Sequence, residues 1–340
     1  MTDVTLSKQA PEPTVTDAEA TDATRAERIT SLLQNQGGVI VLVIVAIAAA
    51  IFSSGFATEG NIVNTMLVGN AYTSLLALGM TFVIISGGID LSVGSVFALG
   101  GVLAAWGVNH GGPLVGILLP LIVCAAWGLV QGLLIAKAGL APFIVTLAGM
   151  LGARGLLQAI SSEGTKTYLV PAHSFFLHLG DGTWVPILTA VALFVIGIVV
   201  LQRTRFGQQL FAIGGNENAA LLMGLPVLRT KTLVYVLSAT LAGGAGMLNA
   251  SRLQSGVTNI GVGYELVAIT AVVIGGTLLT GGAGSITGTA AGVLLLAIIL
   301  NLIGVHLSKY GTAASDAVNG GFLAVVVLLQ SYLSRIQRTQ

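Results

Sequence analysis

Charged residues are scarce in this sequence. Only 8% of its 340 residues are Asp, Glu, Lys or Arg, whereas a soluble domain usually carries about 25%. A soluble chain of this length needs far more polar side chains to cover its surface, so the deficit indicates that lipid covers much of the protein. The net charge is only +1, and no basic stripe with interleaved aromatic residues is present, so we expect no nucleic-acid partner.

Cysteine is almost absent as well. The single cysteine, Cys124, lies in the apolar run 119–130. One thiol excludes a disulfide within the chain and a cysteine-based metal site. We expect Cys124 to be a small buried apolar residue.

Motifs for catalysis and for metal binding are also missing. The sequence has no Gly-x-x-x-x-Gly-Lys-Ser/Thr loop for ATP, no His-Glu-x-x-His and no Gly-x-Ser-x-Gly. Its four histidines are scattered at spacings that fit no common metal motif. We therefore expect no catalytic residue, no metal and no cofactor in this chain.

Apolar residues are abundant, at 54%, and they gather in long runs. A membrane helix needs about 20 mainly apolar residues. This criterion predicts an all-α, polytopic membrane protein with ten spans, give or take one or two. The spans are 37–56, 65–86, 91–109, 113–136, 140–160, 185–201, 231–250, 264–280, 285–305 and 315–333.

Two glycine-rich breaks, at 87–90 and 281–284, interrupt the apolar runs. Broken backbone is allowed at membrane depth where it lines a cavity or is buried in protein, so broken or re-entrant segments are expected there. Residues 1–36 are polar and have no apolar core of a signal peptide. We interpret them as a disordered cytoplasmic tail, followed by one membrane domain, 37–335.

The distribution of Lys and Arg predicts the orientation, because cytoplasmic loops carry the excess of positive charge. With the N-terminus inside, only three basic residues fall in outer loops: Lys166, Arg252 and Lys309. The inside segments then hold Lys8, Arg25, Arg28, Lys137, Arg203, Arg205, Arg229, Lys231, Arg335 and Arg338. Both termini are therefore expected in the cytoplasm.

The inside loop 202–230 contains the signals of a short helix. Asn216 is a good N-cap, Glu217 favours a helix N-terminus, and Gly224 followed by Pro226 ends the helix. The helix leaves apolar side chains at 221–223 partly available. It fits either a groove on a soluble partner or the lipid interface.

Several polar residues within or between the spans are functional candidates, because polar groups in a membrane are costly. Asp90 and Ser92 also fit a simple helix cap. Arg154 in the fifth span either makes a structural contact or lies along a solute path. Glu265 and Asn301 either face a cavity or make interhelical hydrogen bonds.

Four stretches together resemble the permease subunits of monosaccharide ATP-binding-cassette (ABC) importers of the ribose and galactofuranose type. They are Gly87–Ser95 (GGIDLSVGS), Ala141–Met150 (APFIVTLAGM), Arg203–Gly224 (RTRFGQQLFAIGGNENAALLMG) and Glu265–Gly288 (ELVAITAVVIGGTLLTGGAGSITG). The sequences of these stretches are most similar to those of a galactofuranose permease. The resemblance covers the chain from about residue 37 to its end.

The resemblance implies the inner-membrane pore of an ATP-driven sugar importer that works by alternating access. The partners it implies are a cytoplasmic ATPase that binds ATP and Mg²⁺, a second permease, identical or different, and an outer sugar-binding protein. It implies ATPase coupling by Gly215, Asn216, Glu217, Ala219, Ala220 and Gly224, and docking of the binding protein near Arg252 and Glu265. We place Asp90, Ser92, Ser95, Arg154 and Asn301 along the substrate pathway.

Two other functions compete with this interpretation. A facilitator or ion-coupled carrier predicts uptake without an ATPase, although few carboxylates within the spans are available to couple ions. An intramembrane enzyme needs a nucleophile and a base within hydrogen-bond reach, and no motif here indicates such a pair.

Overall fold

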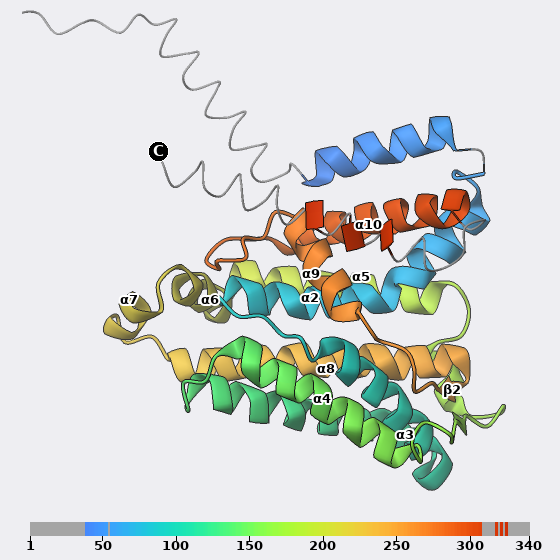
Figure 1. Ribbon diagram of the computed structural model, residues 1–340, viewed down its shortest axis with the longest axis horizontal. Coiled ribbons are helices and arrows are strands. Elements are labelled where there is room, and N and C mark those ends of the chain that lie inside the picture. Colours follow the sequence, from blue (N-terminus) through green and yellow to red (C-terminus); the bar gives the residue numbers. More distant parts are fainter. Residues whose placement is uncertain (1–37, 54, 308–316, 319, 322–323, 326–340) are drawn as a thin grey trace, which may run out of the picture.

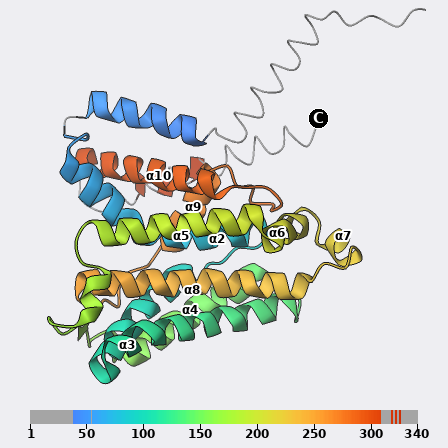
Figure 2. The same ribbon diagram turned by 180° about the vertical axis from the view of Figure 1, so that it is seen from behind.

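The computed structural model describes residues 38–53, 55–307, 317–318, 320–321 and 324–325. The expected tail 1–36 and most of the tenth expected span, 315–333, lie outside this part of the chain. The long helices lie side by side with roughly parallel axes, and α7 and the short strand β2 lie at opposite ends of the bundle (Figures 1 and 2).

The described chain is almost entirely helical. After a first helix, Gly38–Phe52, the elements are η1 (Gly60–Val68), α2 (Gly69–Ile85), α3 (Val93–Ala136), α4 (Pro142–Ile160), β1 (Tyr168–Leu169), η2 (Phe175–Leu179), α5 (Trp184–Arg203), α6 (Arg205–Gly215), α7 (Glu217–Leu222), α8 (Val227–Leu253), β2 (Ser255–Gly256), α9 (Tyr264–Ile274) and α10 (Ile286–Leu307). The two short strands pair antiparallel.

Within the described residues, six helical stretches are long and apolar enough to cross a membrane, and two shorter apolar helices accompany them. The 44-residue α3 is a hairpin, because Gly112 has a φ of 80° and breaks it. The Ser92 hydroxyl then meets the Gln131 side chain at 3.2 Å, although the two residues are 39 positions apart. All nine spans expected before residue 308 are therefore confirmed as helices.

The core lies where α2, α3 and α8 pack together. The largest fully buried side chains include Phe82 on α2, Phe97 on α3 and Tyr235 on α8. Close approach of α3 to α8 depends on glycine: a Cβ at Gly100 would lie 2.6 Å from the Gly243 Cα. Within the described residues, side chains therefore fill the space where α2, α3 and α8 meet.

Two connections enter the bundle instead of staying at its ends. Residues 86–92 run from the end of α2 to the start of α3, and residues 254–263 run back from the end of α8 to the start of α9 (Figure 1). The Asp90 carboxylate accepts a hydrogen bond from the Ser238 hydroxyl at 2.8 Å. Ser238 lies eleven residues beyond Val227, about 16 Å along α8, so Asp90 lies near mid-membrane. The first break matches the expected one at 87–90.

The basic residues fall into two groups, one at each end of the bundle. The end that carries α6 and α7 (Figure 1) also holds Lys137, Arg203, Arg205, Arg229 and Lys231. The opposite end, near β1 and β2, holds Lys166 and Arg252. The helices thus place these residues in the two groups that the sequence predicted.

Candidate functional site

The expected short helix is present as α7, Glu217–Leu222. The Asn216 side chain accepts a hydrogen bond from the Ala219 N–H at 3.0 Å, so it is the N-cap. Gly224 follows the helix with a φ of 76°, and its N–H donates to the Leu221 carbonyl at 2.9 Å. A left-handed glycine of this kind is a common helix stop.

The buried side of α7 consists of one residue. Ala220 is fully buried and packs in a small apolar cluster with Ile213, Leu225 and Val227. The other side is open: Leu222 is 90% exposed, and Leu221 and Met223 are exposed beside it. Because α7 projects beyond the ends of the long helices (Figures 1 and 2), this exposed apolar surface lies at one end of the bundle.

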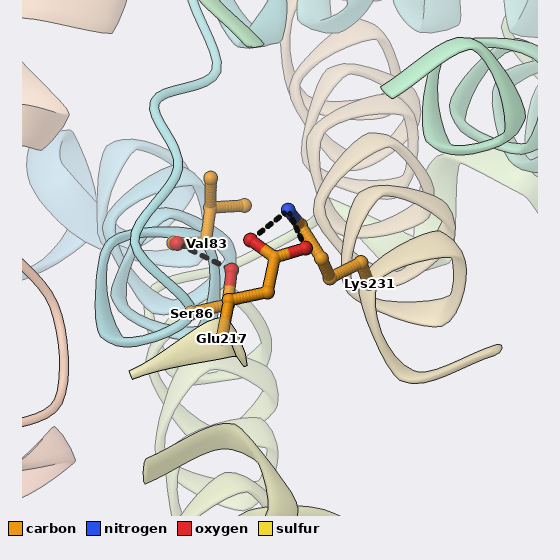
Figure 3. Close-up of polar contacts among 4 residues, drawn as sticks. All are labelled: Val83, Ser86, Glu217 and Lys231. Carbon is orange, nitrogen blue, oxygen red and sulfur yellow. Dashed lines mark hydrogen bonds and ion pairs between the residues drawn. The ribbon is translucent and has the colours of Figure 1, made fainter. Parts of the chain in front are cut away.

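An ion pair fixes the direction of α7 relative to α8. The Lys231 ammonium lies 2.9 Å from a Glu217 carboxylate oxygen (Figure 3). Such a pair near the surface adds at most about 1 kcal/mol of stability, so its main effect is on orientation. Figure 3 also shows the Ser86 hydroxyl, which donates to the Val83 carbonyl at 2.7 Å at the end of α2.

Three segments meet through glycines directly before α7. We call Gly87, Gly214, Gly281 and Gly282 the glycine junction. The Gly282 N–H donates to the Ile85 carbonyl at 3.0 Å. A methyl group at Gly214 would overlap that same carbonyl oxygen, and one at Gly281 would lie 2.8 Å from the Gly87 Cα. The ends of α2 and α6 and the loop between α9 and α10 are therefore in backbone contact.

Asp90 is completely buried in the connection 86–92. Besides the Ser238 hydroxyl, it accepts hydrogen bonds from the Ser92 N–H at 2.9 Å and the Ser92 hydroxyl at 2.6 Å. Ser92 and Ser95 are also buried. The structure thus brings Asp90 and Ser92 together with Ser238, in a polar cluster that joins the start of α3 to α8, whereas Ser95 lies one helical turn after Ser92.

Arg154 and Asn301 both join separate segments. The Arg154 guanidinium on α4 donates to the Thr258 carbonyl at 2.9 Å and to the Ile260 carbonyl at 3.1 Å. It holds the connection 254–263 in place. Asn301 on α10 exchanges amide hydrogen bonds with Asn61 on η1, at 2.8 and 3.1 Å. Both contacts match the structural alternatives that the sequence left open.

Arg252 and Glu265 do not lie on the same surface. Arg252 is exposed at the end of α8 opposite to α7, where it donates to the Gly182 carbonyl at 3.0 Å. Glu265 is half-buried in the first turn of α9, against Gly94 of α3, away from either end of the bundle. This position differs from the outer end that we expected, because α9 begins only after the chain has run back from the end of α8 (Figure 1).

Sequence reasoning missed the partners of the candidate residues. Ser238 and Lys231 lie in one helix without any motif, and Asn61 precedes the second expected span. Gly282 belongs to the expected glycine break, but its contact with the end of α2 has no sequence signal. Each of these residues is recognised only because folding places it beside a residue distant in sequence.

Apolar helices in a bundle, connections at membrane depth and a short capped helix projecting from one end are features of a multi-pass membrane permease. Residues 61–329 match the family model described as branched-chain amino acid transport system / permease component. The match covers more than half of the chain, and the chain belongs to this family.

The chain aligns with several named permeases over most of its length. The chain is 43% identical over 303 residues to the ribose import permease protein RbsC of Bacillus subtilis, covering 88% of this chain and 93% of that one. It is 38% identical to the L-arabinose transport system permease protein AraH of Escherichia coli, covering 89% and 92%. It is 35% identical to the fructose import permease protein FruG of Bifidobacterium longum, covering 86% and 88%. No solved structure matches the chain.

Proposed function

We propose that this chain is the membrane-spanning subunit of an ATP-driven, binding-protein-dependent importer of a monosaccharide. The observation that carries the proposal is the similarity, over 86–89% of the chain, to permeases named for ribose, arabinose and fructose. ATP and Mg²⁺ bind to a separate ATPase subunit. Galactofuranose, ribose and related sugars are all candidate substrates, and alternating access moves the sugar inward.

The coupling step uses α7. Leu221, Leu222 and Met223 present an exposed apolar surface on a short rigid helix, and such a helix fits a hydrophobic groove on a soluble partner. That α7 projects from the bundle supports a partner rather than the lipid interface (Figure 1). Gly215, Asn216, Glu217, Ala219, Ala220 and Gly224 shape and position this coupling helix.

The glycine junction transmits the movement of α7 into the membrane. Gly214 lies in the last turn of α6, the helix before α7, and is next to the end of α2. The connection 86–92 begins at this point and carries Asp90 to mid-membrane. These contacts are between backbone atoms, so a movement of α7 is not lost in the bending of flexible side chains. Closure of the ATPases therefore moves α7 and, through the glycine junction, the two inserted connections.

The proposed orientation puts α7 and both termini in the cytoplasm, across the cell inner membrane. A binding protein docks at the opposite end, where Arg252 is exposed. A second permease, identical or related, completes the pathway, and lipid surrounds the pair.

The test is the composition and activity of the native complex. The tagged chain is extracted from its membrane in mild detergent, its partners are identified by mass spectrometry, and uptake is measured in vesicles. We expect a stoichiometric P-loop ATPase and sugar uptake that requires ATP. A chain that purifies alone under several gentle conditions and moves solute without ATP overturns the proposal in favour of a secondary carrier.

Gly224→Pro tests the coupling helix within that complex. Gly224 has a φ of 76°, which proline cannot adopt, so the substitution distorts the end of α7. We expect normal membrane insertion and no uptake. Normal uptake by this variant contradicts the assignment of α7 to coupling.

A further inference from the structure

The start of α9 exposes an unusual surface. The side chain of Val262 is 75% exposed, and Asn259 and Leu266 are also exposed beside the half-buried Glu265. We call these four residues the α9 face. Asn259 and Val262 belong to the connection 254–263, and Glu265 and Leu266 belong to the first turn of α9, so the face combines non-helical backbone with polar and apolar side chains.

The α9 face lies at membrane depth. A Cβ at Gly261 would overlap the Gly94 carbonyl oxygen and lie 3.4 Å from the Phe97 ring, and a Cβ at Gly246 of α8 would overlap the Phe97 carbonyl oxygen. Gly246 lies seven residues before Leu253, about 10 Å from the end of α8. Gly94 lies two residues beyond Ser92, whose partner Asp90 is near mid-membrane. The connection therefore runs back well into the hydrocarbon region.

Lipid is an unsuitable neighbour for this surface. Non-helical backbone is tolerated at membrane depth only where it is buried in protein or lines a water-filled cavity, and carboxylates there face a cavity or a partner. Arg154 satisfies the Thr258 and Ile260 carbonyls, but it leaves the Asn259 and Val262 side chains exposed.

We propose that the α9 face lines the water-filled path of the transported solute, with Asn259 and Glu265 in contact with the hydroxyl groups of a polyhydroxylated molecule. This inference rests on the proposed function and names the surface that performs it. The Asn259 amide donates and accepts hydrogen bonds and the Glu265 carboxylate accepts them, which matches the hydroxyl groups of a sugar, while Val262 and Leu266 suit its apolar C–H faces.

This assignment moves the path away from Asp90, Ser92 and Ser95. Asp90 already accepts three hydrogen bonds from two serines, and all three residues are buried. Large side chains fill the core around them. The solute therefore passes along the outside of this chain's bundle, and the polar cluster at Asp90 supports the wall of the path.

Thiol labelling tests the proposal directly. Cys124 is buried, so a Cys124→Ala background gives a chain free of cysteine. In the full complex, in membranes, Val262→Cys is treated with a charged methanethiosulfonate reagent that reacts only from water. Val195→Cys is the matched control, because Val195 is the same residue type and is also exposed, at 54%, in the middle of α5. His173→Cys in the exposed outer loop reports that the reagent works.

We expect Val262→Cys to react at least tenfold faster than Val195→Cys in one of two states, nucleotide-free or ATP-trapped. Equal, background rates at both positions in both states, with His173→Cys reactive, overturn the proposal and indicate a protein–protein contact or lipid. Failure of this inference is distinguishable from failure of the proposed function. Labelling without a co-purifying ATPase keeps the path and refutes the importer, whereas ATP-driven uptake without labelling keeps the importer and refutes the path.

Discussion

Asp90 is a buried carboxylate whose hydrogen-bond partners are all neutral. A buried donor left without an acceptor costs about 1–3 kcal/mol, and Asp90→Ala removes the acceptor of the Ser92 N–H and the Ser238 hydroxyl. We therefore expect a marked loss of stability, measured as a lower unfolding temperature of the detergent-solubilised protein.

Asp90→Asn is the matched variant, because its side-chain oxygen still accepts from one of the two serines. It should unfold between the wild type and Asp90→Ala. If Asp90→Ala unfolds at the wild-type temperature, the carboxylate does not hold the connection to α8, and a role in solute contact regains support.

Arg154 makes hydrogen bonds to a single segment, the connection 254–263. Its guanidinium reaches two carbonyls of the connection 254–263 at once, which a lysine ammonium on a flexible stem does less well. Arg154→Ala should increase hydrogen exchange of residues 254–263 severalfold and leave α7 unchanged, as measured by mass spectrometry. Arg154→Lys should give a smaller increase. Equal exchange in all three proteins would show that other contacts hold this connection.

At the scale of the element, hydropathy predicted most of the fold because lipid requires about 20 apolar residues for each span. The capping signals at Asn216 and Gly224 predicted α7 for a similar local reason. Hydropathy did not reveal that α9 begins inside the bundle, because the run 264–280 is as apolar as a complete span. Hydropathy therefore predicts an outer end for Glu265, and it carries no signal for the α9 face.

The glycine junction gives a prediction about coupling between elements. Gly214→Ala places a methyl group against the Ile85 carbonyl and within 2.6 Å of the Gly282 nitrogen. Both are backbone atoms that have little room to move, so the end of α6 must separate from α2. We expect ATP hydrolysis and ATPase binding to persist while uptake per ATP falls at least severalfold.

Gly155→Ala in α4 is the control, because a Cβ at this position meets no other atom within 4 Å. It should transport like the wild type in the same vesicles. A Gly214→Ala complex with the wild-type ratio of uptake to hydrolysis would show that the junction does not transmit the movement of α7.

At the scale of the whole molecule, orientation decides which partner meets which end. Lys137, Arg203, Arg205, Arg229 and Lys231 lie at the α7 end, and Lys166 and Arg252 lie at the other (Figure 1). Because basic loops remain in the cytoplasm, the proposed function requires the α7 end to face the ATPase and the β1–β2 end to face the binding protein. The two functional surfaces that we assign therefore depend on one topology.

Cysteine labelling from one side of the membrane tests that topology. In the Cys124→Ala background, Lys166→Cys should react with an impermeant maleimide added outside intact cells, because Lys166 lies in an exposed loop at the β1–β2 end. Lys137→Cys, in the turn between α3 and α4, should react only after the membrane is permeabilised. The reverse pattern would place α7 outside the cell, where no ATPase can reach it, and would refute the coupling role of α7 regardless of the chain's family.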